Sequence, residues 1–245
     1  MPQFQHGDAS IYYEVHGEGF PILTFAPMGL LSKVSVWDLP NAPIKPLYDL
    51  AQDFQIIVMD QRNAGGLSHA PVTAKTSWDD YADDHIALLD HLDIAQCHVF
   101  GQCIGGPFIF KLLERSPERF CSAVIAQTIG RAAGVALPPP NEIFNKWTAT
   151  VDTLQSTPSE ILDRFYANLY QSGFVYSVNS ESLSQCQIPT AVFAGNDNAH
   201  PLSVSREVAA LLPNNEVFLQ EWKSGAELDV AKASMKAFLL RHTPA

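Results

Sequence analysis

Short apolar runs alternate with segments of helical periodicity along most of the chain. The apolar runs are bounded by turn-forming residues and predict strands over residues 11–16, 21–25, 54–59, 97–100, 120–126, 188–194 and 216–221. Apolar positions that recur at helical spacing predict helices over 78–92, 107–113, 203–212 and 227–240. This alternation indicates an α/β fold with a mostly parallel central sheet of about eight strands and helices on both faces. The hairpin-like start adds antiparallel strands at one edge of that sheet.

The segment between residues 126 and 188 breaks the alternation. It contains a triple proline at residues 138–140 and helix-like stretches over 141–154 and 159–170. An insertion between two strands predicts a small helical lid over the carboxyl edge of the sheet. We therefore expect a core made of residues 1–127 and 188–245, with a lid at 128–187. The segment's aromatic residues either form the core of the lid or face an apolar substrate; they are Phe144, Trp147, Phe165, Tyr166, Tyr170, Phe174 and Tyr176.

Composition narrows the class of protein. The chain has 245 residues, of which 47% are hydrophobic and 17% charged, so it can bury a large core and is not a disordered chain. The net charge of −11 repels phosphate backbones and argues against a nucleic-acid partner.

The start of the chain lacks the features of a signal peptide, and the apolar stretches are too short to cross a bilayer. We expect a cytoplasmic protein with no membrane partner, and leave a homodimer open.

The cysteines show no regular spacing. No CxxC occurs, so they are interpreted as free thiols in a reducing compartment rather than as disulfides or metal ligands. No Gly-rich phosphate loop and no metal-ligand spacing is present either, so neither a cofactor nor a metal is expected. The four residues are Cys97, Cys103, Cys121 and Cys186.

One of these cysteines lies at a sharp turn between a strand and a helix. The sequence from Gly101 to Gly106 reads Gly-Gln-Cys-Ile-Gly-Gly, and it follows a buried strand and opens an apolar helix. Small residues two positions before and after Cys103 allow the close backbone approach that such a turn needs. The helix N-terminus favours an anion, which lowers the pKa of a thiol there. Cys103 is therefore a candidate nucleophile; the alternative is a small buried hydrophobe in a Gly-rich turn.

Four landmarks make the chain resemble the α/β-hydrolase superfamily over essentially its whole length. The elbow around Cys103 is locally similar to that of dienelactone hydrolases, and the rest of the chain is closer to the lidded esterases and lactonases. The landmarks are Phe25-Ala26-Pro27-Met28-Gly29, Met59-Asp60-Gln61-Arg62-Asn63-Ala64-Gly65 with Ser68, the elbow at residues 101–106, and Ala194-Gly195-Asn196-Asp197.

The resemblance implies an oxyanion hole and an acid. One backbone N–H would come from Ile104, after the nucleophile, and another from Met28 or Gly29. The acid would be Asp197, after the seventh core strand, although a turn aspartate is the alternative and Asn198 is its neighbour.

The superfamily's histidine is missing. It would lie near residues 221–223, where the chain reads Glu-Trp-Lys. Among the histidines, His200 stands out because it follows Asp197 by three residues, in a loop expected beside the elbow. It could be the general base for Cys103, or could merely shape the loop before Pro201. The others are interpreted as structural or solvated: His6, His16, His69, His85, His91, His98 and His242.

Two functions follow from these patterns. The first is a hydrolase that cleaves a small, apolar ester, lactone or thioester through Cys103 with an atypical triad. The second is a non-hydrolytic or catalytically degenerate member of the fold that binds a small ligand, as the missing histidine would suggest. Both functions take a small molecule as the partner.

Overall fold

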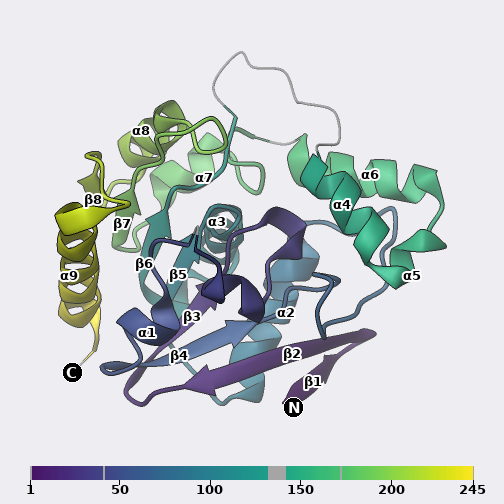
Figure 1. The fold of residues 1–245 in the computed structure, drawn as a ribbon, viewed down its shortest axis with the longest axis horizontal. Helices are drawn as coiled ribbons and strands as arrows, with labels where there is room; N and C mark the ends of the chain where they lie inside the picture. The colour runs from purple at the N-terminus through teal and green to yellow at the C-terminus, as the bar shows by residue number, and fades with distance from the viewer. Residues whose placement is uncertain (1, 41, 132–141, 172, 245) are drawn as a thin grey trace.

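A computed structural model describes residues 2–40, 42–131, 142–171 and 173–244. Its centre is an eight-stranded sheet with the strand order β1-β2-β4-β3-β5-β6-β7-β8 (Figure 1). Pairing is antiparallel between β1 and β2 and between β2 and β4, and parallel between all later neighbours. The strands are β1 (Gln3–His6), β2 (Ala9–His16), β3 (Phe20–Phe25), β4 (Phe54–Met59), β5 (Cys97–Gln102), β6 (Phe120–Ala126), β7 (Thr190–Phe193) and β8 (Asn215–Phe218).

Helices cover both faces of this sheet. Buried side chains alternate between the faces along each central strand, so that Val99 joins one apolar cluster and Phe100 the other. The first cluster includes α2 (Trp78–His91), α3 (Gly105–Arg115) and α8 (Leu202–Leu211). The second includes residues from α9 (Gly225–His242) and from the region around α1 (Pro46–Asp49) and the 3₁₀ turn η2 (Val34–Asp38). The further 3₁₀ turns are η1 (Gly29–Leu31) and η3 (Pro117–Arg119).

The predicted fold class and the antiparallel edge are confirmed. The strands β4 and β6 have the predicted bounds, and α2 begins at the predicted residue, Trp78, where Ser77 and Asp80 form a reciprocal capping box. The last strand, expected over 216–221, ends at Phe218. The chain leaves the sheet there, and the Trp222 indole N–H donates to the Ala194 carbonyl at 2.8 Å.

Four helices lie between β6 and β7: α4 (Glu142–Thr150), α5 (Asp152–Gln155), α6 (Ser159–Tyr170) and α7 (Ser180–Gln185). The stretch expected as one helix over 141–154 is divided at Val151 into α4 and α5, whereas α6 has the predicted bounds. The prolines 138–140 lie outside the described residues. The role of this segment as a lid stays a prediction.

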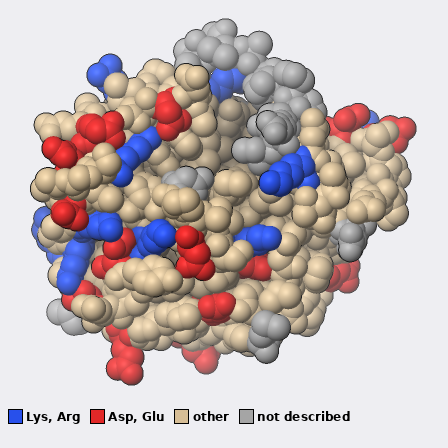
Figure 2. Space-filling model, viewed as in Figure 1, with Lys and Arg blue, Asp and Glu red and all other residues tan. Residues whose placement is uncertain are grey.

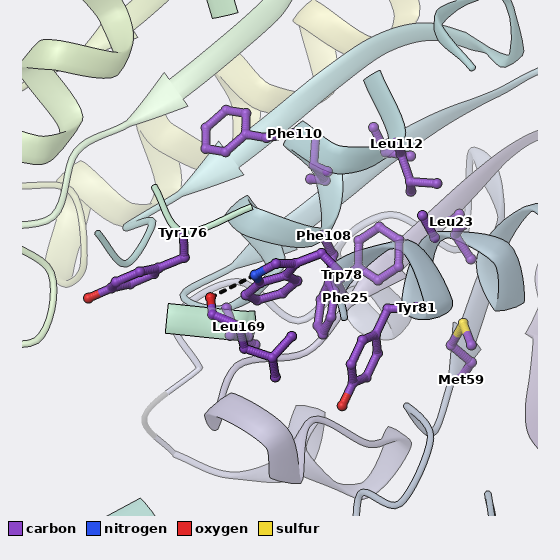
Figure 3. Packing of buried hydrophobic residues seen from close by; sticks show 14 of the residues in the cluster. Leu23, Phe25, Met59, Trp78, Tyr81, Phe108, Phe110, Leu112, Leu169 and Tyr176 are labelled. Carbon is purple, nitrogen blue, oxygen red and sulfur yellow. Dashed lines mark hydrogen bonds between the residues drawn. The ribbon is translucent and has the colours of Figure 1, made fainter. Parts of the chain in front are cut away.

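Two indole hydrogen bonds connect this segment to the core. Trp147 on α4 donates to the Asn63 carbonyl at 2.6 Å, and Trp78 on α2 donates to the Leu169 carbonyl at 2.7 Å (Figure 3). Phe144, Trp147 and Phe165 are buried and pack against one another in the first apolar cluster. For these three aromatics, packing is the role that the structure shows.

Charged side chains of both signs are interspersed on the face drawn in Figure 2. Several form ion pairs, such as Lys232 with Asp49 at 2.9 Å and Arg241 with Glu216. Among the described helices, none combines the length and the apolar character that crossing a bilayer requires.

Candidate active site

The elbow at Cys103 connects β5 to α3. Cys103 has φ = 59°, in the left-handed region that non-glycine residues rarely adopt. A Cβ atom added at Gly101 would lie 2.8 Å from the backbone of Gly105, and one added at Gly105 would lie 3.0 Å from the Phe25 carbonyl oxygen. The glycines therefore permit the tight turn, and the turn places the Cys103 side chain above the carboxyl edge of the sheet.

Three backbone N–H groups are directed at the Cys103 sulfur. They belong to Ile104, Met28 and Gly29, and each lowers the pKa of the thiol. Met28 and Gly29 have φ values of 86° and 57° at the start of η1, which turns their amides toward the elbow. The turn is held by Ser32, whose hydroxyl donates to the Ala26 carbonyl at 2.7 Å. All three residues expected to form an oxyanion hole thus lie around the sulfur.

The net electrostatic effect on the thiol differs from the expectation. Burial raises the pKa of Cys103 to about 11, and the three N–H donors only partly offset it, while the negative charge of Asp197 raises it further. The expectation that the helix terminus lowers the pKa below its ordinary value is therefore wrong. Desolvation outweighs the local dipoles because the sulfur is only partly exposed. At neutral pH the side chain is a thiol and needs a base to become a nucleophile.

Asp197 and His200 lie together in the loop after β7. The Asp197 carboxylate accepts hydrogen bonds from the His200 backbone N–H at 2.9 Å and its ring Nδ1 at 2.8 Å. Burial lowers the pKa of His200, and Asp197 opposes this effect. The other ring nitrogen, Nε2, is buried and has no hydrogen-bond partner among the described residues. With Nδ1 protonated toward Asp197, Nε2 presents its lone pair.

Lys223 also belongs to this site, although the sequence did not predict a role for it. Its Nζ atom lies 2.9 Å from Oδ2 of Asp197, on the side of the carboxylate opposite to His200. Burial raises the pKa of Asp197, but Lys223 and His200 outweigh it and bring the pKa to about 2. Residue 223 lies in the segment where the resemblance places the histidine, but its contact with Asp197 is visible only in the folded structure.

A cavity of about 620 Å³ brings these groups together. Cys103, Met28, Asp197, His200 and Lys223 all line it. The remaining lining residues are Pro27, Pro40, Ala42, Pro43, Lys45, Gln127, Ala199 and Leu228.

The other histidines lie elsewhere. The two buried ones hydrogen-bond other side chains, His85 to Gln61 at 2.6 Å and His98 to Ser122 at 2.8 Å. His200 is the histidine that lines this cavity among the residues that the structure describes.

The landmark loop at Asp60 supports the site from outside it. The Asp60 carboxylate accepts hydrogen bonds from the backbone N–H groups of Val34 and Leu67, at 2.8 and 2.7 Å. Arg62 is buried and pairs with Asp84 at 2.8 Å. The Val34 contact joins this loop to the segment that follows Met28 and Gly29, and the Arg62 pair joins it to α2, so the contacts shown for this motif are structural.

The described part of the chain contains no group of three or more His, Cys, Asp or Glu side chains arranged to hold a metal ion.

Several known proteins are similar to this chain in sequence or in fold. The putative carbamate hydrolase RutD of Azorhizobium caulinodans is 34% identical over 137 residues, which are 55% of this chain and 47% of that protein. The chain thus spans about half the length of the curated relatives it matches. Est816, described as an N-acyl homoserine lactone degrading enzyme, has a TM-score of 0.69 with 24% identity, over 99% of this chain and all of that one. The enol-lactonase from Burkholderia xenovorans LB400 has a TM-score of 0.70 with 17% identity, over 98% of this chain and all of that one.

The structural likenesses, at these identities, concern the fold. The sequence itself matches the family described as alpha/beta hydrolase fold over residues 39–167, a range that includes the elbow and more than half of the chain. The chain therefore belongs to the α/β-hydrolase fold family.

Proposed function

We propose that the protein is a hydrolase that cleaves a small ester, lactone or thioester, with Cys103 as nucleophile, His200 as general base and Asp197 as the group that orients the base. The observation that carries this proposal is that His200 and Cys103 line one cavity, while the buried Nε2 of His200 has no hydrogen-bond partner within the part of the chain that the structure describes. A base held by a carboxylate through its other nitrogen is the arrangement that proton transfer from a nucleophile requires.

Acylation begins at the thiol. As the Cys103 sulfur attacks the carbonyl carbon, its proton passes to Nε2 of His200 and the carbonyl π electrons move to oxygen. The N–H groups of Ile104, Met28 and Gly29 then hold the oxyanion. Collapse of this intermediate breaks the bond to the leaving group, which takes the proton from His200. An acyl thioester on Cys103 remains.

Deacylation uses the same groups in the reverse order. A water molecule gives a proton to Nε2 of His200 while its oxygen attacks the thioester carbonyl. The second oxyanion collapses, the Cys103 sulfur leaves, and His200 returns the proton to it. The products are a carboxylic acid and the alcohol or thiol of the leaving group, which remain one molecule when the substrate is a lactone.

The cavity supports a small substrate. Its volume falls in the range of roughly 300 to 1,000 Å³ that is usual for small-molecule sites. Pro27, Pro43 and Leu228 give part of the lining an apolar character that would suit an apolar acyl group. The carbamate and lactone substrates named for similar proteins also carry an acyl carbon bonded to a leaving heteroatom. We further propose that residues 128–187 form a lid over this edge of the sheet.

The first test measures turnover and adduct formation together. We expect the protein to hydrolyse an activated short-chain ester such as p-nitrophenyl acetate, and Cys103→Ala to lower the rate to the background of the uncatalysed reaction. Intact-protein mass spectrometry should detect an acetyl adduct on the native protein only. The control is Cys186→Ala, which removes another partly exposed thiol that does not line the cavity. Equal rates for the native protein and Cys103→Ala would contradict the proposal.

One observation favours the second function. Because burial keeps the Cys103 side chain protonated, the resting site holds no preformed thiolate. A protein that only binds a small ligand would give neither turnover nor an adduct with esters, thioesters and lactones. An adduct without turnover would indicate a nucleophile arrested after acylation.

A further inference from the structure

Asp197 is shared between two cation-forming side chains from different parts of the chain. One oxygen, Oδ1, accepts from Nδ1 of His200 at 2.8 Å, and the other, Oδ2, accepts from Nζ of Lys223 at 2.9 Å. His200 follows β7 along the chain, whereas Lys223 lies between β8 and α9. The carboxylate therefore has a fixed orientation, with each oxygen assigned to one partner.

The segment that carries Lys223 is anchored by the two residues that directly precede the lysine. Trp222 is buried and its indole N–H donates to the Ala194 carbonyl at 2.8 Å, directly before the Asp197 loop. Glu221 accepts a hydrogen bond from the Asn196 side chain. The Lys223 side chain is 21% exposed, so its ammonium is held at Asp197 rather than extended into solvent. The Asp197 side chain is 46% exposed, so the pair lies at the mouth of the site, and the Trp222 and Glu221 contacts hold the lysine's segment beside the Asp197 loop.

We propose that Lys223 is a positioning residue of the Cys103 site: by occupying Oδ2 of Asp197 it confines His200 to Oδ1, and so fixes the imidazole ring with Nε2 as its proton acceptor. This inference rests on the proposed function of His200. It assigns Lys223 no contact with the substrate and no proton transfer.

Lys223 has a second effect through charge. A cation beside Asp197 opposes formation of the imidazolium ion, and Lys223 lowers the pKa of His200 together with burial, while Asp197 raises it. The charged and titratable groups that line the cavity with His200 are Asp197 from its own loop, Lys223 from the segment before α9, Cys103 from the elbow and Lys45 from the segment before α1. Without Lys223, the negative charge of the Asp197 carboxylate would be compensated by His200 alone, which favours the protonated imidazolium form of His200. His200 would then be protonated, and inactive as a base, at a higher pH.

The test follows the imidazole directly. In a Cys103→Ala background, NMR titration of the His200 ring should show a higher pKa in Lys223→Met, with Lys223→Arg restoring the value found with lysine. Lys232→Met is the matched control, because Lys232 also pairs with a carboxylate, Asp49, at 2.9 Å but does not line the cavity. An unchanged His200 titration in Lys223→Met, or the same change in Lys232→Met, would overturn the proposal.

The pH profile gives the functional readout. In the protein with Cys103 present, the acid limb of kcat/KM should move to higher pH in Lys223→Met, and for a shift of one unit the rate relative to its plateau approaches a loss of about tenfold at pH values well below both pKa values. An acid limb that does not move would contradict the inference. The NMR titration uses a protein without the nucleophile, so its result is independent of turnover. Failure of the proposed function would appear instead as a native protein no faster than Cys103→Ala.

Discussion

The Cys103 sulfur is subject to opposing influences from burial and from the backbone. Burial raises the pKa of the thiol to about 11, while the amides of Ile104, Met28 and Gly29 favour the anion. These donors are worth most when negative charge develops beside them, which is the situation in a tetrahedral intermediate. The residue is therefore better suited to attack with simultaneous loss of its proton than to act as a preformed thiolate.

His200→Ala should test this dependence on a base. We expect kcat/KM to fall by roughly 10²-fold or more, because the thiol would have no acceptor for its proton at neutral pH. The measurement is steady-state ester hydrolysis. His69→Ala is the control, since His69 is exposed and does not line the cavity. A rate that is unchanged in His200→Ala would exclude His200 from the mechanism.

At the scale of elements, the strand-to-helix turn is the feature most sensitive to substitution. Gly101→Ala should destabilise the fold by roughly 2 to 3 kcal/mol, because the new methyl group would lie 2.8 Å from the Gly105 backbone, where no flexible side chain can yield. Urea denaturation measures the change. Gly7→Ala provides the comparison: φ is 55° there and no atom lies within 4 Å of the added Cβ, so backbone strain alone should cost about 1 kcal/mol. Equal losses in the two variants would contradict the steric argument.

Elements with strong apolar patterns were predictable from the sequence. The strands β4 and β6 and the helix α6 have the predicted bounds because burial and periodicity determine them locally. The short strand β1 was missed, since two of its four residues are exposed and its pairing with β2 is not visible in an apolar pattern. The edge strand β8 was expected to extend to residue 221 but ends at Phe218. The hydrogen bond of Trp222 to Ala194 that accompanies this end is a tertiary contact, which the local sequence does not reveal.

The residues of the candidate site were likewise only partly predictable from the sequence. Cys103, Ile104, Met28 and Gly29 could be named from the sequence because the elbow and the loop after β3 are local motifs. The participation of Lys223 could not, because its meaning depends on a contact with Asp197 across 26 positions in the chain. The direction of the Cys103 pKa shift could not be predicted from the sequence either, because desolvation of the thiol depends on all the atoms that pack around the sulfur.

At the scale of the whole molecule, buried histidines connect stability to pH. Burial lowers the pKa of His85 to about 3 and that of His98 to about 4. In the unfolded chain both would titrate near the ordinary value of ~6.5, so between the folded and unfolded values the unfolded state binds more protons. The stability that the two neutral histidines contribute is therefore fully present above the unfolded-state pKa, and it is lost as the pH falls from that pKa toward the folded-state values.

We accordingly expect the free energy of unfolding to decrease between pH 6 and pH 5, by up to about 1.4 kcal/mol for each of the two histidines. Urea denaturation at a series of pH values measures this slope. His85→Gln should flatten the slope by the contribution of one proton, whereas His69→Gln, at an exposed position, should leave it nearly unchanged. A slope that is the same in the native protein and His85→Gln would contradict the assignment.

The shared carboxylate of Asp197 bears on how such a site can change during evolution. Because its two oxygens point to residues 200 and 223, one acid can serve an imidazole arriving from either side. A lineage could gain a histidine at one position before losing it at the other, and no ancestor along that route would have lacked a base. Two single substitutions would then exchange the origin of the histidine while the nucleophile, the acid and the sheet beneath them stayed as they were.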